Sequence, residues 1–100
     1  MKLGKVAHAR AGDKGEVVNV SVISYKEEQY ELIKEKLSQE RVEKFFTSVL
    51  KREIQVKKYE LPKIKALNFV IENAIPGVTY SLALDKHGKT LSSILLEIEL

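Results

Sequence analysis

The sequence has no cysteine and no tryptophan, and among its 100 residues there are only two prolines, two histidines and one methionine. The lack of cysteine excludes disulfides, thiolate nucleophiles and Cys-ligated zinc. Because small secreted domains usually depend on disulfides, we expect a cytoplasmic protein. No apolar run approaches the roughly 18 residues that a membrane-spanning helix needs, and the N-terminal segment lacks the apolar core of a signal peptide. We therefore expect no membrane association.

The length and composition indicate one globular domain over residues 1–100. Apolar residues make up 44% of the chain and charged residues 31%, which suits a packed core with a solvated surface. A domain of this size buries roughly 65% of the surface that its unfolded chain exposes. No repeat, linker or low-complexity tract divides the chain.

The charge balance is mildly basic, at +3, and most of the excess lies between residues 51 and 65. Such a stretch could attract a phosphate-bearing ligand or nucleic acid, but a solvated strand and helix start is the more common explanation. Nucleic-acid binding is disfavoured, because Tyr59 is the sole aromatic residue there and the aromatic motif of ferredoxin-like RNA binders is absent. The stretch contains Lys51, Arg52, Lys57, Lys58, Lys63 and Lys65 against Glu53 and Glu60.

The apolar pattern predicts secondary structure in eight pieces. Ser38 is placed to cap the second helix, and the segment 85–89 has the residues of a hairpin turn. The predicted order is β-β-α-α-β-α-β-β, which favours an α+β domain with a mostly antiparallel sheet and helices on one face. The predicted strands are 3–10, 17–24, 54–60, 79–85 and 90–100, and the predicted helices are 26–37, 39–50 and 64–74.

Alternation along the first two strands predicts an open sheet face that carries polar side chains. Val18, Val20 and Val22 share one face of the strand 17–24 and are core candidates. The opposite faces of the two strands carry His8, Arg10, Asn19 and Ser21. Such side chains suit solvent, a ligand or a partner.

The most informative segment is the glycine-rich stretch between the first two strands. Gly12 and Gly15 would let the backbone take positive φ twice, so that successive N–H groups point into one anion-binding concavity. Arg10 and Lys14 add positive charge, and Asp13 could orient them or act as a base. The same residues also make a good hairpin turn, and a purely structural turn remains the alternative interpretation.

Other residues give weaker signals. Asn68 lies in an apolar run, so its amide needs partners; it could hold the glycine-rich loop or contact a ligand. His8 lies near the loop, whereas His87 lies in a turn. No Ser-His-Asp set is present, and two histidines without cysteine make a poor transition-metal site. Catalysis by this chain alone is weakly supported, and no cofactor is indicated.

The segment Ala-Arg-Ala-Gly-Asp-Lys-Gly-Glu-Val-Val-Asn-Val at residues 9–20 resembles a motif of the AtuA-like ferredoxin-fold domain. Residues 59–69 and the segments between residues 81 and 99 are also similar to that family. The domain commonly follows a large N-terminal domain in acyclic terpene utilization proteins. Two positions depart from the motif: Ala11 replaces its serine, and Glu16 replaces its second aspartate.

The resemblance implies an α+β, ferredoxin-like sandwich that acts as a free-standing small subunit, with a separately encoded large partner. It names no reaction. The expected function is to complete a site for acyl or CoA-linked metabolites, and the alternative is a homo-oligomeric regulatory module that binds a small anion. The candidate ligand- or partner-binding residues are His8, Arg10, Gly12, Asp13, Lys14, Gly15, Asn19 and Asn68.

Overall fold

The computed structural model describes residues 1–14, 17–51, 53–72 and 90–100. Within them, four strands form one antiparallel sheet in the order β1-β2-β4-β3. The predicted hairpin of the first two strands is confirmed, and so is the strand predicted at 54–60. The strands are β1 (Ala7–Lys14), β2 (Val17–Ser24), β3 (Gln55–Leu61) and β4 (Ala66–Glu72).

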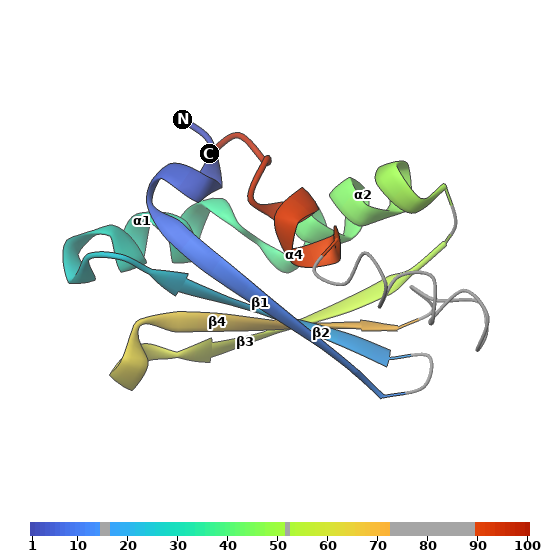
Figure 1. The fold of residues 1–100 in the computed structure, drawn as a ribbon, viewed down its shortest axis with the longest axis horizontal. Helices are drawn as coiled ribbons and strands as arrows, with labels where there is room; N and C mark the ends of the chain where they lie inside the picture. The colour runs from blue at the N-terminus through green and yellow to red at the C-terminus, as the bar shows by residue number, and fades with distance from the viewer. Residues whose placement is uncertain (15–16, 52, 73–89) are drawn as a thin grey trace.

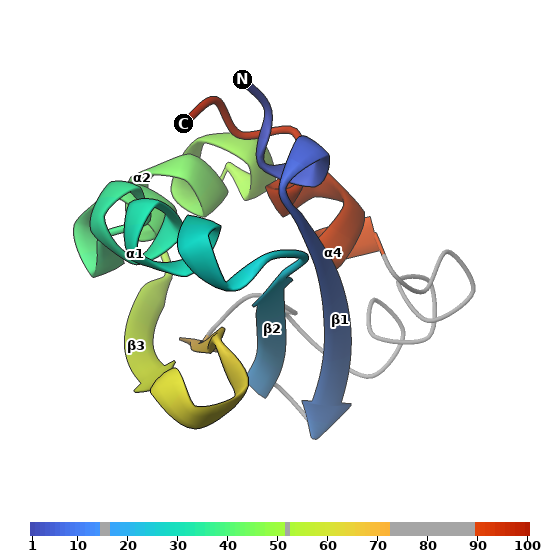
Figure 2. The ribbon, with the colours of Figure 1, turned by 90° about the vertical axis from the view of Figure 1, so that its left-hand side faces the viewer.

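Three α-helices of the described chain cover one face of this sheet and leave the other face open (Figures 1 and 2). They are α1 (Glu27–Lys36), α2 (Gln39–Leu50) and α4 (Thr90–Leu95). The first two match the prediction closely, and Ser38 caps α2 as expected, because its Oγ accepts a hydrogen bond of 3.1 Å from the backbone N–H of Arg41. The architecture is the predicted α+β, ferredoxin-like sandwich.

The core lies between the sheet and the helices. Val18, Val20 and Val22 are at most 3% exposed, which confirms the predicted inward face of β2. Burying such side chains contributes about 1.5–3 kcal/mol each before entropy is counted. The largest buried side chains that join them are Leu3 and Leu37, with Tyr30 and Ile33 of α1, Phe46 of α2, Leu67, Phe69 and Ile71 of β4, and Leu95 of α4.

The helix predicted at 64–74 is wrong. Pro62–Ile64 form a short 3-10 helix, η2, and the chain then continues as β4. Leu67, Phe69 and Ile71 are buried in alternation, which is the period of a strand. β4 is paired on both sides, with β2 and β3, so tertiary pairing overrode a local pattern that also fitted a helix.

The strand predicted at 90–100 is also wrong. The segment begins as α4, and its buried apolar residues are Leu91, Leu95 and Ile98, at helical rather than alternating spacing. The other predicted strand, 79–85, and the turn at 85–89 lie outside the described residues.

The first predicted strand starts too early and ends too early. Leu3–Lys5 form a 3-10 helix, η1, and β1 runs from Ala7 to Lys14 rather than over 3–10. The N-terminal segment lies beside the C-terminal one, as Figure 1 shows. Three backbone hydrogen bonds of 2.9 Å join them: Leu3 N–H to the Ile98 carbonyl, Gly4 N–H to the Leu96 carbonyl, and Leu100 N–H to the Met1 carbonyl.

The outer edge of β3 is capped by side chains of α2. The backbone N–H of Val56 donates to Glu43 Oε1 at 2.9 Å, and the N–H of Lys58 donates to Gln39 Oε1 at 2.9 Å. Alternate N–H groups of an edge strand point away from the sheet and would otherwise be open to another strand. These two bonds also tie α2 to the sheet.

Candidate functional site

The open face, meaning the sheet face turned away from the helices, carries a polar row that crosses all four strands. Antiparallel pairing places directly opposite residues on the same face, with Cβ atoms roughly 4.5–5.5 Å apart. The register therefore aligns one polar side chain from each strand. The row consists of Arg10 of β1, Ser21 of β2, Asn68 of β4 and Tyr59 of β3.

The middle of this polar row is held by one hydrogen bond. Ser21 Oγ donates to Asn68 Oδ1 at 3.2 Å, and both groups are partly buried. The bond occupies the amide oxygen and leaves the amide nitrogen of Asn68 as a donor. Arg10 is exposed and forms no ion pair with any residue that the structure describes. The row therefore offers a guanidinium on β1 and an amide N–H donor on β4, with β2 between them, and each group can bind an oxyanion.

The rows on either side differ in character. One consists of His8, Ile23, Ala66 and Leu61, and is mostly apolar. The other consists of Gly12, Asn19, Val70 and Lys57. The prediction that His8, Arg10, Asn19 and Ser21 share the open face is thus confirmed by the register. Gly12 and Asn68 join them there.

The glycine-rich segment is not the loop that the sequence suggested. Gly12, Asp13 and Lys14 belong to β1 and pair with Asn19, Val18 and Val17. Gly12 does not take the positive φ that the predicted anion-binding concavity requires. Gly15 lies outside the described residues.

Asn68 lies on β4 rather than on the predicted helix. Its side-chain hydrogen bond within the described chain comes from Ser21, not from the glycine-rich segment. Sequence reasoning also missed Tyr59 and Tyr25, which are 49% and 61% exposed. Tyr59 lies three residues after the buried Val56 on the same strand, so alternation places its side chain on the opposite face of the sheet. The sequence pattern of residues 54–60 could therefore have assigned Tyr59 to the open face.

The basic stretch 51–65 is divided among different surfaces. Lys57 lies on the open face, 3.8 Å from Glu72. Lys58 points to the helix side, where its Nζ donates to the Lys34 carbonyl at 2.6 Å, and burial lowers its pKa. Lys65 Nζ lies 5.5 Å from the ring centre of Tyr30. These three lysines of the stretch therefore lie on different surfaces rather than in one patch.

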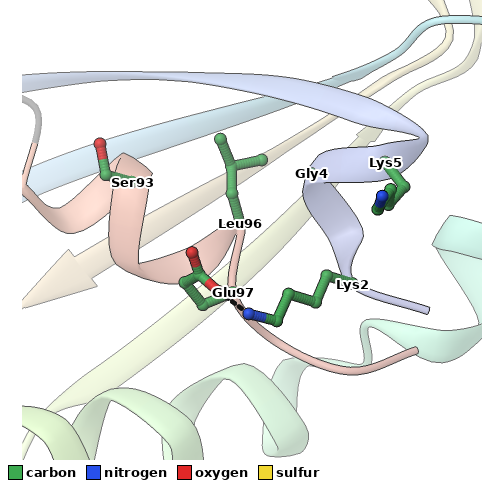
Figure 3. A pocket seen from close by; sticks show the side chains of 6 residues that line it. All are labelled: Lys2, Gly4, Lys5, Ser93, Leu96 and Glu97. Carbon is green, nitrogen blue, oxygen red and sulfur yellow. Dashed lines mark hydrogen bonds and ion pairs between the residues drawn. The ribbon is translucent and has the colours of Figure 1, made fainter.

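A pocket of about 370 Å³ lies away from the open face, where the two ends of the chain meet. Lys2 reaches across it to an ion pair with Glu97, and this contact raises the pKa of Lys2 (Figure 3). None of the predicted site residues lines it. The lining residues are Lys2, Gly4, Lys5, Ser93, Leu96 and Glu97.

No group of three or more His, Cys, Asp or Glu residues among the described residues is arranged to hold a metal ion. No helix in the part of the chain that the structure describes is long and apolar enough to cross a membrane.

Comparison with protein families agrees with the fold and with the resemblance carried by residues 9–20, a segment that includes Arg10 of the polar row. The family model of the AtuA ferredoxin-like domain matches residues 1–100. The chain belongs to this family. No curated protein and no solved structure matches it. The motif of the AtuA ferredoxin-like domain, at residues 9–20, thus covers most of β1 and the start of β2, and its Arg10 and Asn19 lie on the open face.

Proposed function

We propose that this AtuA ferredoxin-like domain is an accessory subunit whose open face completes a metabolite site on a larger, acyclic-terpene-utilization-like protein. The observation that carries the proposal is the polar row, with exposed Tyr59 at one end and, at the other, Arg10, which has no ion pair among the described residues. Contact with solvent alone does not require a guanidinium, a hydroxyl and an amide at directly opposite positions of neighbouring strands.

The chemistry of the row suits a carboxylate or phosphate of an acyl or CoA-linked metabolite. Arg10 offers a planar fork to an oxyanion, and the amide nitrogen of Asn68 adds a neutral donor. The Ser21 bond fixes the orientation of that amide. Apolar side chains on the same face, Val17 and Leu61, are 38% and 41% exposed and give a protein partner contact area.

The first experiment is a tagged pull-down from the native host with mass spectrometry of the proteins that co-purify. We expect a large acyclic-terpene-utilization-like protein in near-equal amount. The complex is then reconstituted with Arg10→Ala and, as a matched control, with Lys44→Ala, which removes an exposed cation from α2 on the helix side. Arg10→Ala should weaken metabolite binding by the complex at least tenfold, and Lys44→Ala should not. Equal metabolite affinity for both variants would overturn the role of the row.

The second candidate is a stand-alone homo-oligomeric module that binds a small anion. The exposed Val17, Tyr59 and Leu61 favour it, because they would be covered if two open faces met. Light scattering of the purified chain, with and without acetate or CoA, tests it. A monomer at all concentrations, with no ligand-induced thermal shift, would count against this candidate.

A further inference from the structure

An aromatic pair stands at one end of the open face, next to the polar row. The rings of His8 and Tyr25 are stacked, with centres 5.4 Å apart and planes inclined by 28°. Tyr25 follows directly after β2, and its backbone N–H donates a hydrogen bond of 2.9 Å to the Val6 carbonyl. This bond fixes the backbone of Tyr25, from which the side chain extends. Tyr25 is nevertheless 61% exposed, so a large part of its ring surface is available to a ligand.

The stack is held by ring contact rather than by hydrogen bonding. Nδ1 of His8 is buried and has no hydrogen-bond partner among the described residues. The imidazole is half-buried at its place on β1 and backs the phenol ring. A large exposed aromatic ring that is already supported on one side loses little freedom when a second flat group stacks on it.

Arg10 lies on the same face of β1 as His8, two residues further along, which corresponds to roughly 6.5 Å along the strand. The backbone positions of His8 and Arg10 are therefore separated by about the length that a ribose bridges between a base and its phosphate, and Arg10 has no ion pair among the described residues. Beyond Arg10 the row continues with Ser21, whose hydroxyl donates to Asn68 Oδ1, and with the amide N–H donors of Asn68.

We propose that the His8–Tyr25 pair and Arg10 bind an adenine nucleotide, with the base stacked on Tyr25 and a phosphate held by Arg10. The inference rests on the proposed function in one respect: the metabolite bound at the open face would contain a nucleotide, as coenzyme A does. The ligand surface is complementary at each point: a flat π-system meets an aromatic ring, and a phosphate meets a guanidinium.

Charge on the described part of the face favours a small nucleotide over a nucleic-acid strand. Among the cations of this face whose side chains the structure describes, Arg10 has no ion pair, and Lys57 Nζ lies 3.8 Å from Glu72 Oε1. A single-stranded nucleic acid needs a longer positive track and successive stacking rings. Tyr59 is the other strongly exposed aromatic residue of this face, and it lies across the whole sheet from Arg10.

The test is isothermal titration of the full chain with three probes: adenosine 3′,5′-bisphosphate, coenzyme A and inorganic pyrophosphate. We expect both nucleotides to bind and pyrophosphate to bind at least tenfold more weakly. Tyr25→Ala should weaken nucleotide binding about tenfold or more, the size of a lost base stack, whereas Tyr25→Phe should keep it. Leu32→Ala, which trims a side chain of α1 that is 37% exposed, is the matched control and should bind like the parent.

Three results of these titrations would overturn the inference, and a fourth comes from an RNA probe. The first three are no binding of either nucleotide at millimolar concentration, equal binding of pyrophosphate and nucleotide, and unchanged nucleotide affinity of Tyr25→Ala. Tight binding of an eight-residue oligoadenylate RNA without binding of the bisphosphate would also overturn it, in favour of a nucleic-acid surface. Circular dichroism of each variant confirms folding.

The outcome is separable from that of the proposed function. Co-purification of a large partner with Tyr25→Ala would show that the subunit role stands while the nucleotide assignment is judged by titration. Nucleotide binding by a chain that recovers no partner would instead keep this inference and reject the subunit role.

Discussion

Glu43 of α2 accepts a hydrogen bond of 2.9 Å from the backbone N–H of Val56, on the outer edge of β3. Val56 is 2% exposed, so water cannot easily replace the carboxylate. The contact satisfies a buried donor, and it blocks the edge position where a strand of another molecule would pair.

Glu43→Ala should lower the free energy of unfolding by about 1–3 kcal/mol, because it leaves the Val56 N–H buried without an acceptor. Glu43→Gln keeps an acceptor oxygen and should lose less than half of that amount. Urea denaturation measures both, with Lys44→Ala on the same helix as the control. If the alanine and glutamine variants were equally stable, the hydrogen bond would not be the source of the effect.

Tyr30→Phe should be neutral or slightly stabilising at pH 7. The Tyr30 hydroxyl is buried and has no hydrogen-bond partner among the described residues, so its removal costs no bond. The ring stays in contact with the ammonium groups of Lys34 and Lys65, at 5.7 and 5.5 Å from its centre. Thermal unfolding measures the change, and a loss above about 1 kcal/mol would reveal a partner for the hydroxyl.

The Tyr30→Phe substitution should also change how the free energy of unfolding depends on pH in alkaline solution. Burial raises the pKa of Tyr30 in the folded protein, and nearby Glu60 adds to this effect. The unfolded chain therefore releases its phenolic proton first, near pH 10, and the folded state loses relative stability as the pH rises from there toward the folded pKa. Tyr30→Phe should lose less stability between pH 9 and 11 than the parent. Parallel curves for the two proteins would contradict the assignment.

Ser38→Ala should cost about 1 kcal/mol, because it removes the acceptor for the Arg41 N–H at the start of α2. Ser38→Asp should retain most of the stability, since aspartate caps the same position and its charge suits the helix N-terminus. Denaturant midpoints compare the two. A more stable alanine variant would mean that the cap contributes nothing here.

Gly12→Ala should be tolerated or should stabilise by up to about 1 kcal/mol. A Cβ at this position would meet Asn19 Oδ1 at 3.5 Å, an ordinary contact, and the backbone does not use the glycine-only region. A turn that needed positive φ would instead be destabilised by roughly that amount. Thermal unfolding therefore distinguishes the observed strand from the predicted glycine loop.

The sequence could predict those elements whose signals are local. The alternation of Val18, Val20 and Val22 indicated a strand, and the Ser38 cap indicated where α2 begins. The same alternation assigned His8, Arg10 and Asn19 to the open face. These predictions needed no knowledge of what lies beside each strand.

The errors arose where partners far along the chain decide the structure. In residues 64–72, Leu67, Val70 and Ile71 fit a helix, while Leu67, Phe69 and Ile71 fit a strand. Pairing with β2 and β3 on both sides selected the strand. The polar row shows the same limit, because the alignment of Arg10 with Tyr59 depends on strand order and register, which no single segment encodes.

The sheet order has a consequence for how the chain reaches its native state. β1 and β2 are consecutive, and β3 and β4 are joined across four residues, so each hairpin closes over a short distance. The seam between β2 and β4 is different: Ser21 and Asn68, which meet there, are 47 positions apart. Closing so long a segment costs chain entropy before the contacts between β2 and β4 form and offset it. Docking of the two hairpins should therefore set the folding rate. Substitutions along this seam would then slow folding, whereas those in the capped edge of β3 would chiefly speed unfolding.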